Sequence, residues 1–331
     1  MKGSHILSTG SAVPNISIDN QSLSQTLNTS DEWISARTGI RRRRILDRSR
    51  SITDLAAEAC HKALKNGLLK ATDIDLIILA TSSQHDLFGS ASEIQALIGA
   101  KNAIAFDITA ACSGFVIALA TATKFIETGT YKNVLVVGAD ILSRWVDWSD
   151  RRTCILFGDG AGAAILQLHK SNKNDILSFQ LDTNGLASHH LSIPYRKGYT
   201  NTEQICNSNG KYSYLTMNGK EVYKFAVSKV PESIKKCLKK ANICTQDISW
   251  LLLHQANQRI LETVADKLNI PGHKIISNIQ YYGNTSAASI PLALDEAFQS
   301  GHICNGDIIV IAGFGAGLTW GTTIIRWNVM E

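Results

Sequence analysis

The chain has 331 residues, and 33 Lys and Arg against 28 Asp and Glu give it a formal net charge of +5. Hydrophobic residues make up 44% of the sequence and charged residues 18%, which excludes a disordered or fibrous protein. The length provides for one large domain or two of ordinary size. The first segment, MKGSHILSTGSAVPN, has neither the apolar core of a signal peptide nor the arginine-rich pattern of a transit peptide.

Strand and helix signals alternate along the chain. Short apolar runs predict strands, and amphipathic stretches between them predict helices. In chain order we predict a helix over 52–64, strands over 76–80 and 104–108, a helix over 113–128, strands over 134–138 and 163–168, a helix over 230–239, a strand over 250–253, a helix over 285–300 and strands over 308–312 and 322–325. This alternation predicts an α/β fold with a largely parallel sheet.

An uncharged stretch over 308–325 reaches the length of a membrane span. Because four glycines interrupt it, we predict two short strands around a glycine turn and no membrane segment. The cysteines are odd in number and none forms a C-x-x-C pair, so a reducing compartment is expected, with neither disulfides nor a zinc site. They are Cys60, Cys112, Cys154, Cys206, Cys237, Cys244 and Cys304.

The sequence repeats itself once. Segment 62–79 matches 236–253 at an offset of 174, and segment 113–137 matches 285–309 at an offset of 172. These offsets predict two halves of similar topology, 1–172 and 173–331, related by a pseudo-two-fold axis. In this alignment Cys112 lies opposite Asn284, and Ala80 lies opposite His254. Because open α/β sheets place their sites at strand ends, we expect Cys112, His254 and Asn284 to converge near the axis.

Cys112 lies between a predicted strand and a predicted helix. A helix N-terminus stabilises an anion by up to about 2 kcal/mol, which would lower a thiol pKa from about 8.5 to near 7. A fully poised nucleophile would still need a nearby base. The alternative is a buried structural cysteine.

His254 and Asn284 each have an ordinary alternative role, as a hydrogen-bonded histidine at a strand end and as a turn or N-cap residue. Together, an imidazole and a carboxamide can donate to one carbonyl oxygen on which negative charge develops. That suits an enolate formed by decarboxylation, which then attacks a thioester on Cys112. A hydrolase would need a carboxylate that orients the histidine, and no such residue is evident in the sequence.

Two glycine-rich runs, 157–163 and 313–321, continue into apolar strands and not into helices. This excludes a dinucleotide fingerprint and favours tight turns that bring backbone N–H groups near the site. Half of segment 37–50 is arginine. A solvated basic face is one interpretation, and a nucleic-acid tail is disfavoured because the chain has no nucleic-acid motif.

Seven motifs, in order, resemble β-ketoacyl-acyl carrier protein synthase III, a condensing enzyme of the thiolase superfamily that initiates fatty-acid synthesis. They are SDEWISARTGIR at 30–41, AACSGF at 110–115, DR at 150–151, GDGAG at 158–162, HQAN at 254–257, GNTSAAS at 283–289 and GAGLTWG at 315–321. The resemblance implies a duplicated thiolase-like fold with αβαβα layers. It also implies condensation of a short acyl-CoA, with acetyl-CoA expected, with malonyl-acyl carrier protein, giving 3-oxoacyl-acyl carrier protein, CoA and CO2.

The resemblance assigns roles to individual residues. Cys112 is the nucleophile, His254 and Asn284 promote decarboxylation, and the backbone N–H groups of Cys112 and Ala316 form the oxyanion hole. Three further sets bind the substrates. Coenzyme A is assigned to Trp33, Arg37, Arg151, Gly219 and Asn257; carrier-protein docking to Gln255, Arg259 and Lys224; and the far end of the acyl pocket, across a homodimer interface, to Leu87 and Phe88. Whether Arg41–Arg44 do more than face solvent stays open.

The family uses a coenzyme A thioester as substrate and has no metal or tightly bound cofactor, and it implies neither a nucleic-acid nor a membrane partner. A bacterial cytoplasm and a plastid stroma, for a plastid-encoded protein, are both compatible with the sequence. The alternatives are a specialised starter enzyme of secondary metabolism, a non-catalytic scaffold on the same fold and a nucleic-acid-binding protein.

Overall fold

The computed structural model describes residues 2–171, 173–195 and 211–328, so that Cys206 lies outside the described residues. Two five-stranded sheets form the centre of the molecule. In sheet order, the first consists of β1 (Ser4–Ala12), β7 (Asp159–Leu168), β6 (Asn133–Ile141), β4 (Leu76–Ala80) and β5 (Ile104–Ile108). The second consists of β8 (Ile176–Thr183), β14 (Thr319–Arg326), β13 (Ile308–Gly315), β11 (Trp250–Leu253) and β12 (Ile275–Ile276).

The two sheets have the same topology, which confirms the duplicated fold. In each sheet the last three strands in this order are parallel, and the first three are antiparallel. In each sheet four of the five strands therefore run in the same direction, and one strand, β7 or β14, runs the opposite way, which agrees with the prediction of a largely parallel sheet. Strands β13 and β14, joined by the short η8 (Ala316–Leu318), form an antiparallel pair, as predicted for the uncharged stretch. No helix in the described residues is long and apolar enough to span a membrane.

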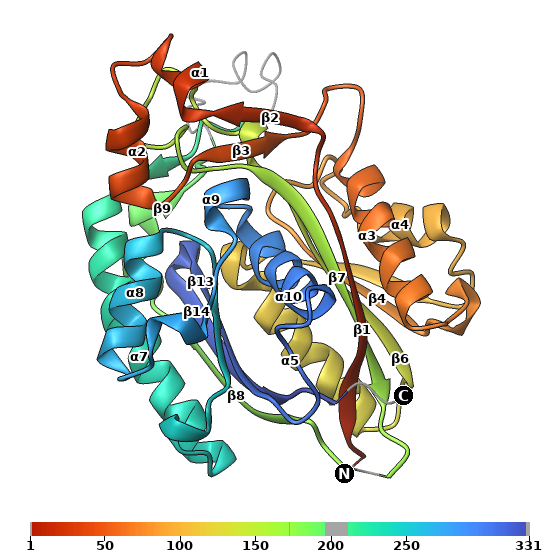
Figure 1. The fold of residues 1–331 in the computed structure, drawn as a ribbon. Coiled ribbons are helices and arrows are strands. Elements are labelled where there is room, and N and C mark those ends of the chain that lie inside the picture. Colours follow the sequence, from red (N-terminus) through yellow and green to blue (C-terminus); the bar gives the residue numbers. More distant parts are fainter. Residues whose placement is uncertain (1, 172, 196–210, 329–331) are drawn as a thin grey trace.

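The helices complete five layers (Figure 1). Helices α3 (Ile52–Asn66) and α4 (Ala91–Ile98) cover the outer face of the first sheet, and α7 (Gly219–Ala241) and α8 (Gln258–Lys267) cover that of the second. Helices α5 (Gly114–Glu127) and α10 (Ser289–Gln299) lie between the sheets. The connection from β7 to β8 joins the two sheets, and we keep 1–172 and 173–331 as the proposed division into halves.

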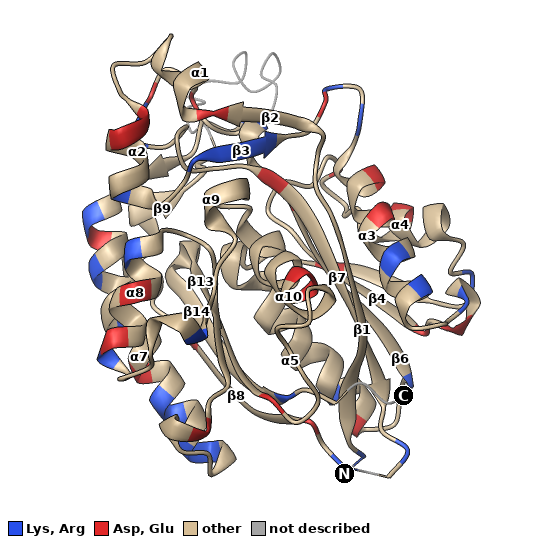
Figure 2. Cartoon of the chain, in the orientation of Figure 1, with Lys and Arg blue, Asp and Glu red and all other residues tan. Residues whose placement is uncertain are grey.

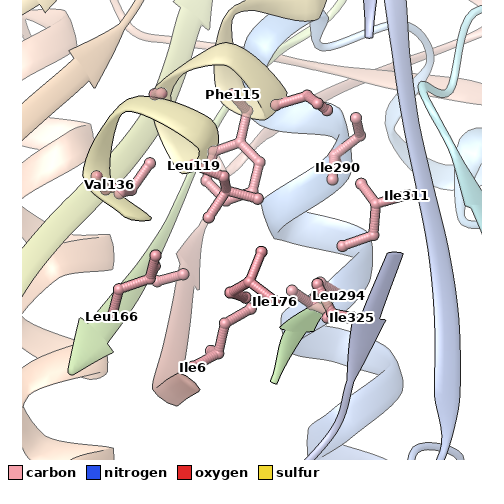
Figure 3. Packing of buried hydrophobic residues seen from close by; sticks show 14 of the residues in the cluster. Ile6, Phe115, Leu119, Val136, Leu166, Ile176, Ile290, Leu294, Ile311 and Ile325 are labelled. Atoms are coloured by element: carbon pink, nitrogen blue, oxygen red, sulfur yellow. The ribbon is translucent and has the colours of Figure 1, made fainter. Parts of the chain in front are cut away.

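Apolar side chains from both halves pack into one core around the two central helices (Figure 3). The residues labelled there are Phe115 and Leu119 of α5, Ile290 and Leu294 of α10, Ile6, Val136 and Leu166 of the first sheet, and Ile176, Ile311 and Ile325 of the second. All are buried, so that the hydrophobic effect acts across the boundary between the halves and holds them as one unit.

The strand register corrects part of the sequence alignment. Leu76 pairs with Val134 in the first sheet, and Trp250 pairs with Ile309 in the second. Leu76 and Trp250 correspond at the predicted offset of 174. Val134 then corresponds to Ile309, an offset of 175 and not the predicted 172.

The lengths of the central helices and of the connections that follow them explain this difference. Two non-glycine residues with positive φ precede them, Ala111 at 47° and Ser286 at 51°, at an offset of 175. Two glycines with positive φ follow them, Gly129 at 79° and Gly301 at 77°, at an offset of 172. Helix α10 is thus about one turn shorter than α5. The structural counterpart of Cys112 is therefore Ala287, and its predicted pairing with Asn284 is wrong.

Most predicted elements are present at or near their predicted bounds. The main exception is α7, which begins at Gly219 and not at residue 230. Pro231 lies inside this helix, and proline in a helix interior removes a hydrogen bond and usually marks a boundary. Packing of Ala226, Val230 and Ile234 against the second sheet carries the helix through the proline.

A small cap covers one end of both sheets (Figure 1). It contains β2 (Ile16–Asp19), α1 (Asn20–Ser24), α2 (Asp31–Thr38) and β3 (Arg42–Ile45), with β2 and β3 paired antiparallel. The Ser30 hydroxyl accepts a hydrogen bond from the Trp33 N–H and so caps the start of α2.

Candidate active site

Cys112, His254 and Asn284 line one cavity of about 120 Å³. Their exposed fractions are 5%, 1% and 7%. Cys112 lies in η2 (Ala111–Ser113), directly before α5, and His254 directly follows β11. Asn284 lies in the loop before η7 (Ser286–Ala288). The fold thus brings the three residues together, although they do not occupy equivalent positions in the two halves.

A glycine of the second half allows strand β13 to lie against the thiol. A Cβ atom on Gly315 would be 3.0 Å from both the Cβ and the backbone N of Cys112, and 3.3 Å from its Sγ. Any larger residue at 315 would displace the cysteine or the strand. The second glycine-rich run therefore brings the backbone close to Cys112. This agrees with its interpretation as a turn that brings the backbone to the site, and not as a dinucleotide fingerprint.

The Cys112 thiol is neutral in the free protein. Burial raises its pKa to about 12, and the charge of Asp140 acts in the same direction. The Ser286 hydroxyl, 3.3 Å from Sγ, favours the thiolate but does not offset burial. The prediction of a thiol pKa near 7 is therefore wrong, because desolvation outweighs stabilisation by the helix N-terminus.

His254 is a neutral imidazole. Burial lowers its pKa to about 3, and its ring packs edge-on against Phe314 with 5.2 Å between ring centroids. Nδ1 lies 2.7 Å from the Ser289 hydroxyl oxygen. This contact occupies Nδ1 and leaves Nε2 as the ring nitrogen available to a ligand.

The buried neutral state of His254 predicts a pH-dependent stability. The unfolded chain binds a proton near pH 6.5, whereas the folded chain does so only near pH 3. Between these values the unfolded state binds more protons, so the free energy of unfolding decreases as pH falls, by about 2 kcal/mol at pH 5 from His254 alone. Denaturant unfolding at pH 8 and pH 5 measures this decrease.

The His254→Asn variant is the control for this measurement. Its stability should fall by about 2 kcal/mol less between the two pH values than that of the unaltered protein. The second buried histidine with a lowered pKa, His5, contributes to both proteins and cancels from the comparison. Equal losses in the two proteins would mean that His254 is protonated in the fold.

Asn284 presents the donor end of its amide to the cavity. Its Oδ1 accepts a hydrogen bond from the Ser286 N–H at 2.9 Å, which assigns the oxygen and leaves Nδ2 as the free end. Its backbone is held on both sides: its N–H donates to the Leu156 oxygen at 2.8 Å, and its oxygen accepts from the Gly158 N–H at 3.0 Å. The Nε2 atom of His254 and the Nδ2 atom of Asn284 are thus two neutral potential donors on one cavity.

A second cavity, of about 360 Å³, also contains Cys112 together with Ala316. Its large apolar lining residues are Leu142, Phe157, Leu191, Ile193 and Leu215. Leu87 lines a neighbouring cavity of about 200 Å³ that shares Ile193 with this one, whereas the side chain of Phe88 is fully exposed. Space for an acyl group therefore lies beside the thiol.

The residues predicted to bind coenzyme A lie close together. The guanidinium carbons of Arg37 and Arg151 are 5.0 and 5.1 Å from the centroid of the Trp33 ring system. The Asn257 amide donates to the Arg37 carbonyl at 3.0 Å, which joins α8 to α2. Asn257 and Gly219 also line the cavity that contains Cys112, His254 and Asn284. A flat ring and two guanidinium planes are suited to a nucleotide base.

The predicted docking residues divide into exposed and buried ones. Arg259 and Lys224 are exposed on α8 and α7, where Lys and Arg residues are frequent (Figure 2). Gln255 is completely buried, and its amide donates to the Leu253 and Ile276 carbonyls at 2.7 and 3.2 Å. Its predicted contact with a carrier protein is therefore wrong, because a buried side chain that fixes the turn after β11 cannot meet a partner.

The sequence did not predict two buried charged residues near the Cys112 cavity, Asp140 and Arg43. Asp140 accepts hydrogen bonds from the Ser82 N–H at 2.8 Å and the Ala287 N–H at 3.1 Å, which joins β6 to η7. The feature that could have identified Asp140 is its place as an acidic residue in an otherwise apolar strand. Arg43, one of the four arginines left open above, is also completely buried. No group of three or more potential metal-binding side chains occurs in residues 2–171, 173–195 and 211–328.

Comparisons with known proteins agree with the geometry. The family model described as 3-oxoacyl-[acyl-carrier-protein (ACP)] synthase III matches residues 106–185, and the model of its C-terminal part matches residues 238–327. The chain is 58% identical to the β-ketoacyl-[acyl-carrier-protein] synthase III of Trichormus variabilis, over 98% of both chains. It is 56% identical to the protein of that name from Porphyra purpurea, over 98% of this chain and all of that one.

Solved structures lead to the same family. The crystal structure of 3-oxoacyl-[acyl-carrier-protein] synthase III from Aquifex aeolicus is 43% identical, with a TM-score of 0.90 over 98% of this chain and all of that chain. Together with the Cys-His-Asn cavity, these full-length similarities show that the chain belongs to the β-ketoacyl-acyl carrier protein synthase III family of condensing enzymes.

Proposed function

We propose that this chain condenses acetyl-CoA with malonyl-acyl carrier protein, with Cys112 as the nucleophile and His254 and Asn284 as the decarboxylating pair. The observation that carries this proposal is that a thiol and two neutral donor groups line one cavity. A second cavity beside the thiol has room for an acyl group. No tightly bound cofactor or metal takes part in the proposed reaction.

In the first half-reaction, the Cys112 sulfur attacks the carbonyl carbon of the acyl-CoA. A new C–S bond forms, the bond to the coenzyme A sulfur breaks, and the thiol proton passes to the departing coenzyme A. Because burial disfavours a free thiolate, the proton leaves as the new bond forms. The backbone N–H groups of Cys112 and Ala316 stabilise the oxyanion.

In the second half-reaction, the malonyl thioester oxygen accepts hydrogen bonds from His254 Nε2 and Asn284 Nδ2. The bond to the carboxylate breaks, CO2 leaves, and the electron pair forms an enolate that both donors stabilise. The enolate carbon then attacks the acyl group on Cys112, which forms the new C–C bond. The released thiolate takes up one proton and the enzyme is regenerated.

Coenzyme A is proposed to bind with its adenine at Trp33 and Arg151, its phosphates near Arg37 and its pantetheine arm along Gly219 and Asn257. The carrier protein is proposed to dock on α7 and α8 through Arg259 and Lys224. Such exposed charges mainly raise the association rate with an acidic partner.

A homodimer through strand β5 is part of the proposal. This edge strand exposes the apolar side chains of Ile104 and Phe106, which a second copy would cover. The fully exposed Phe88 would then reach the acyl pocket of the partner. The bacterial and algal relatives support a bacterial cytoplasm or a plastid stroma as the compartment.

The Trp33→Ala variant separates the two substrates. Acetyl-CoA carries an adenine, whereas the carrier protein presents the same pantetheine arm without one. Loss of the stacking surface should raise KM for acetyl-CoA by about 5- to 30-fold, as expected for about 1–2 kcal/mol of base stacking. KM for malonyl-acyl carrier protein should stay within about twofold. Steady-state kinetics with each substrate varied in turn measures both, and equal increases would contradict the placement of adenine at Trp33.

An acyl-CoA series with malonyl-acyl carrier protein, scored by CO2 release and product mass, tests the proposed function. A preference for acetyl-CoA supports a role at the start of fatty-acid synthesis. A preference for medium, branched or aromatic acyl groups would instead indicate a specialised starter enzyme. Absence of turnover with every acyl-CoA would contradict the proposal.

A further inference from the structure

Arg43 is a buried cation outside the catalytic cavity. It lies on β3, and burial lowers its pKa to about 10, so it keeps its charge at neutral pH. None of the ion pairs found among the described residues involves it. Burying a charge without a carboxylate is unfavourable unless neutral acceptors hold it in place.

Three oxygen acceptors hold this guanidinium. Nη1 donates to the Ile18 carbonyl at 3.1 Å, and Nη2 donates to the Asn20 Oδ1 at 2.8 Å and to the Ile155 carbonyl at 2.9 Å. Arg43 therefore joins β2 and the start of α1 to the segment that begins at Ile155.

That segment holds Asn284. The next residue, Leu156, accepts the hydrogen bond of the Asn284 N–H, and the N–H of Gly158 donates to the Asn284 oxygen. The Arg43 contact at Ile155 thus lies one residue from the first of these two bonds. A displacement of segment 155–158 would carry the Asn284 backbone, and with it the Nδ2 donor, away from its position.

The Cβ atom of Arg43 lies near the two segments that hold Asn284. A Cβ atom on Gly158 would lie 3.1 Å from the Cβ of Arg43, and one on Gly283 would lie 3.5 Å from it. Gly283 directly precedes Asn284. The Cβ atom of Arg43 therefore lies beside the Asn284 loop, in addition to the hydrogen bond that its guanidinium makes to Ile155.

We propose that Arg43 is a positioning residue for Asn284, and that its guanidinium fixes segment 155–158 so that the Asn284 amide meets the enolate oxygen during decarboxylation. This inference rests on the proposed function. Arg43 makes no contact with the reacting atoms. It acts through the backbone that holds Asn284. Arg43 should therefore matter more for decarboxylation than for acylation of Cys112, to which the same segment contributes only the lining side chain of Phe157.

The Asn20 contact offers a competing route of action. The Asn20 amide donates to the Asp31 carboxylate at 2.7 Å, and Asp31 begins the helix that carries Trp33. An arginine that acted through this arm would affect coenzyme A binding and raise KM for acetyl-CoA. The two routes therefore predict different kinetic changes.

The test measures the half-reactions separately in Arg43→Gln and Arg43→Lys. Arg43→Gln should lower the rate of CO2 release from malonyl-acyl carrier protein by about 10- to 100-fold, the scale expected for a displaced catalytic group. Acylation of Cys112 by acetyl-CoA, and KM for acetyl-CoA, should stay within about threefold. Arg43→Lys keeps the charge and some donors and should give an intermediate rate. If Arg43→Gln does not fold, the same measurements on Arg43→Lys provide the test.

Arg42→Gln is the matched control, since Arg42 is the neighbouring exposed arginine of the same strand and loses the same charge. It should keep both rates. The double variant with Arg43→Gln and Asn284→Ala should release CO2 at a rate within about twofold of that of Asn284→Ala alone, because the effect of Arg43 passes through Asn284. Equal losses in both half-reactions, a raised KM for acetyl-CoA, or a full additional loss in the double variant would overturn the inference. Failure of the proposed function is distinct, since the unaltered protein would then release no CO2.

Discussion

Replacing Cys112 by alanine is expected to abolish transfer of the acetyl group from acetyl-CoA to the protein and to lower condensation by at least about 10⁴-fold. No other described cysteine lines the cavity that holds His254 and Asn284. Release of CO2 from malonyl-acyl carrier protein should persist in this variant, because both donors to the enolate remain. Intact-mass measurement of the acylated protein and a CO2 assay report the two results.

Cys60→Ala is the matched control for this variant. Cys60 is a buried cysteine whose pKa burial also raises to about 12, but it lies on the outer helix α3. This variant should be acetylated as fully as the unaltered protein. Acetylation that persists without Cys112, or that is lost without Cys60, would contradict the assignment of the nucleophile.

Replacing His254 by alanine is expected to lower CO2 release by about 10³-fold, the upper range for loss of one hydrogen-bond donor to an oxyanion. Acylation of Cys112 should fall by less than about tenfold, because the buried neutral imidazole is not required to hold the thiol as a thiolate. Rapid-quench measurement of each half-reaction separates these effects.

Asn284→Ala is the companion variant, with an expected loss of about 10²- to 10³-fold in CO2 release. Both variants should therefore share one kinetic pattern, a slow second half-reaction after a nearly unchanged first one. If His254→Ala instead slowed acylation as much as decarboxylation, His254 would be the base for Cys112 and not a neutral donor to the enolate.

The duplicated fold explains why the two halves contribute different groups to one cavity. Helices α5 and α10 lie side by side between the sheets, and each begins after a non-glycine residue with positive φ. The first half places Cys112 at this point, whereas the second half places His254 and Asn284 on the loops around it. The proposed nucleophile and the proposed enolate donors thus lie on different halves of one packed core.

Much of this arrangement was predictable from the sequence. Strand bounds such as Leu76–Ala80 and Trp250–Leu253 agree with the structure, because short apolar runs between polar turns have few other conformations. The repeat also predicted that Cys112, His254 and Asn284 converge, although its pairing of Cys112 with Asn284 was wrong. The offset was misjudged because the ends of the two central helices match at 172, although α10 is about one turn shorter than α5 and the connection from Gly301 to β13 is longer by the same amount.

Burial of polar residues was not predictable from the sequence. Gln255 and Arg43 have side chains that are usually exposed, and only the three-dimensional packing shows that buried backbone carbonyls accept hydrogen bonds from them. The pKa of Cys112 was misjudged for the same reason. A helix N-terminus is visible in a sequence, whereas the desolvation that outweighs it depends on the closely packed second half.

The most direct test of the account is a rapid-quench experiment with labelled acetyl-CoA. The unaltered protein is first acylated and freed of coenzyme A, and malonyl-acyl carrier protein is then added. The label should leave Cys112, appear in 3-oxoacyl-acyl carrier protein together with one CO2 per acyl group, and do so at least as fast as steady-state turnover. Label that stays on Cys112 while product forms, or transfer slower than turnover, would contradict the central claim that the Cys112 thioester is the intermediate.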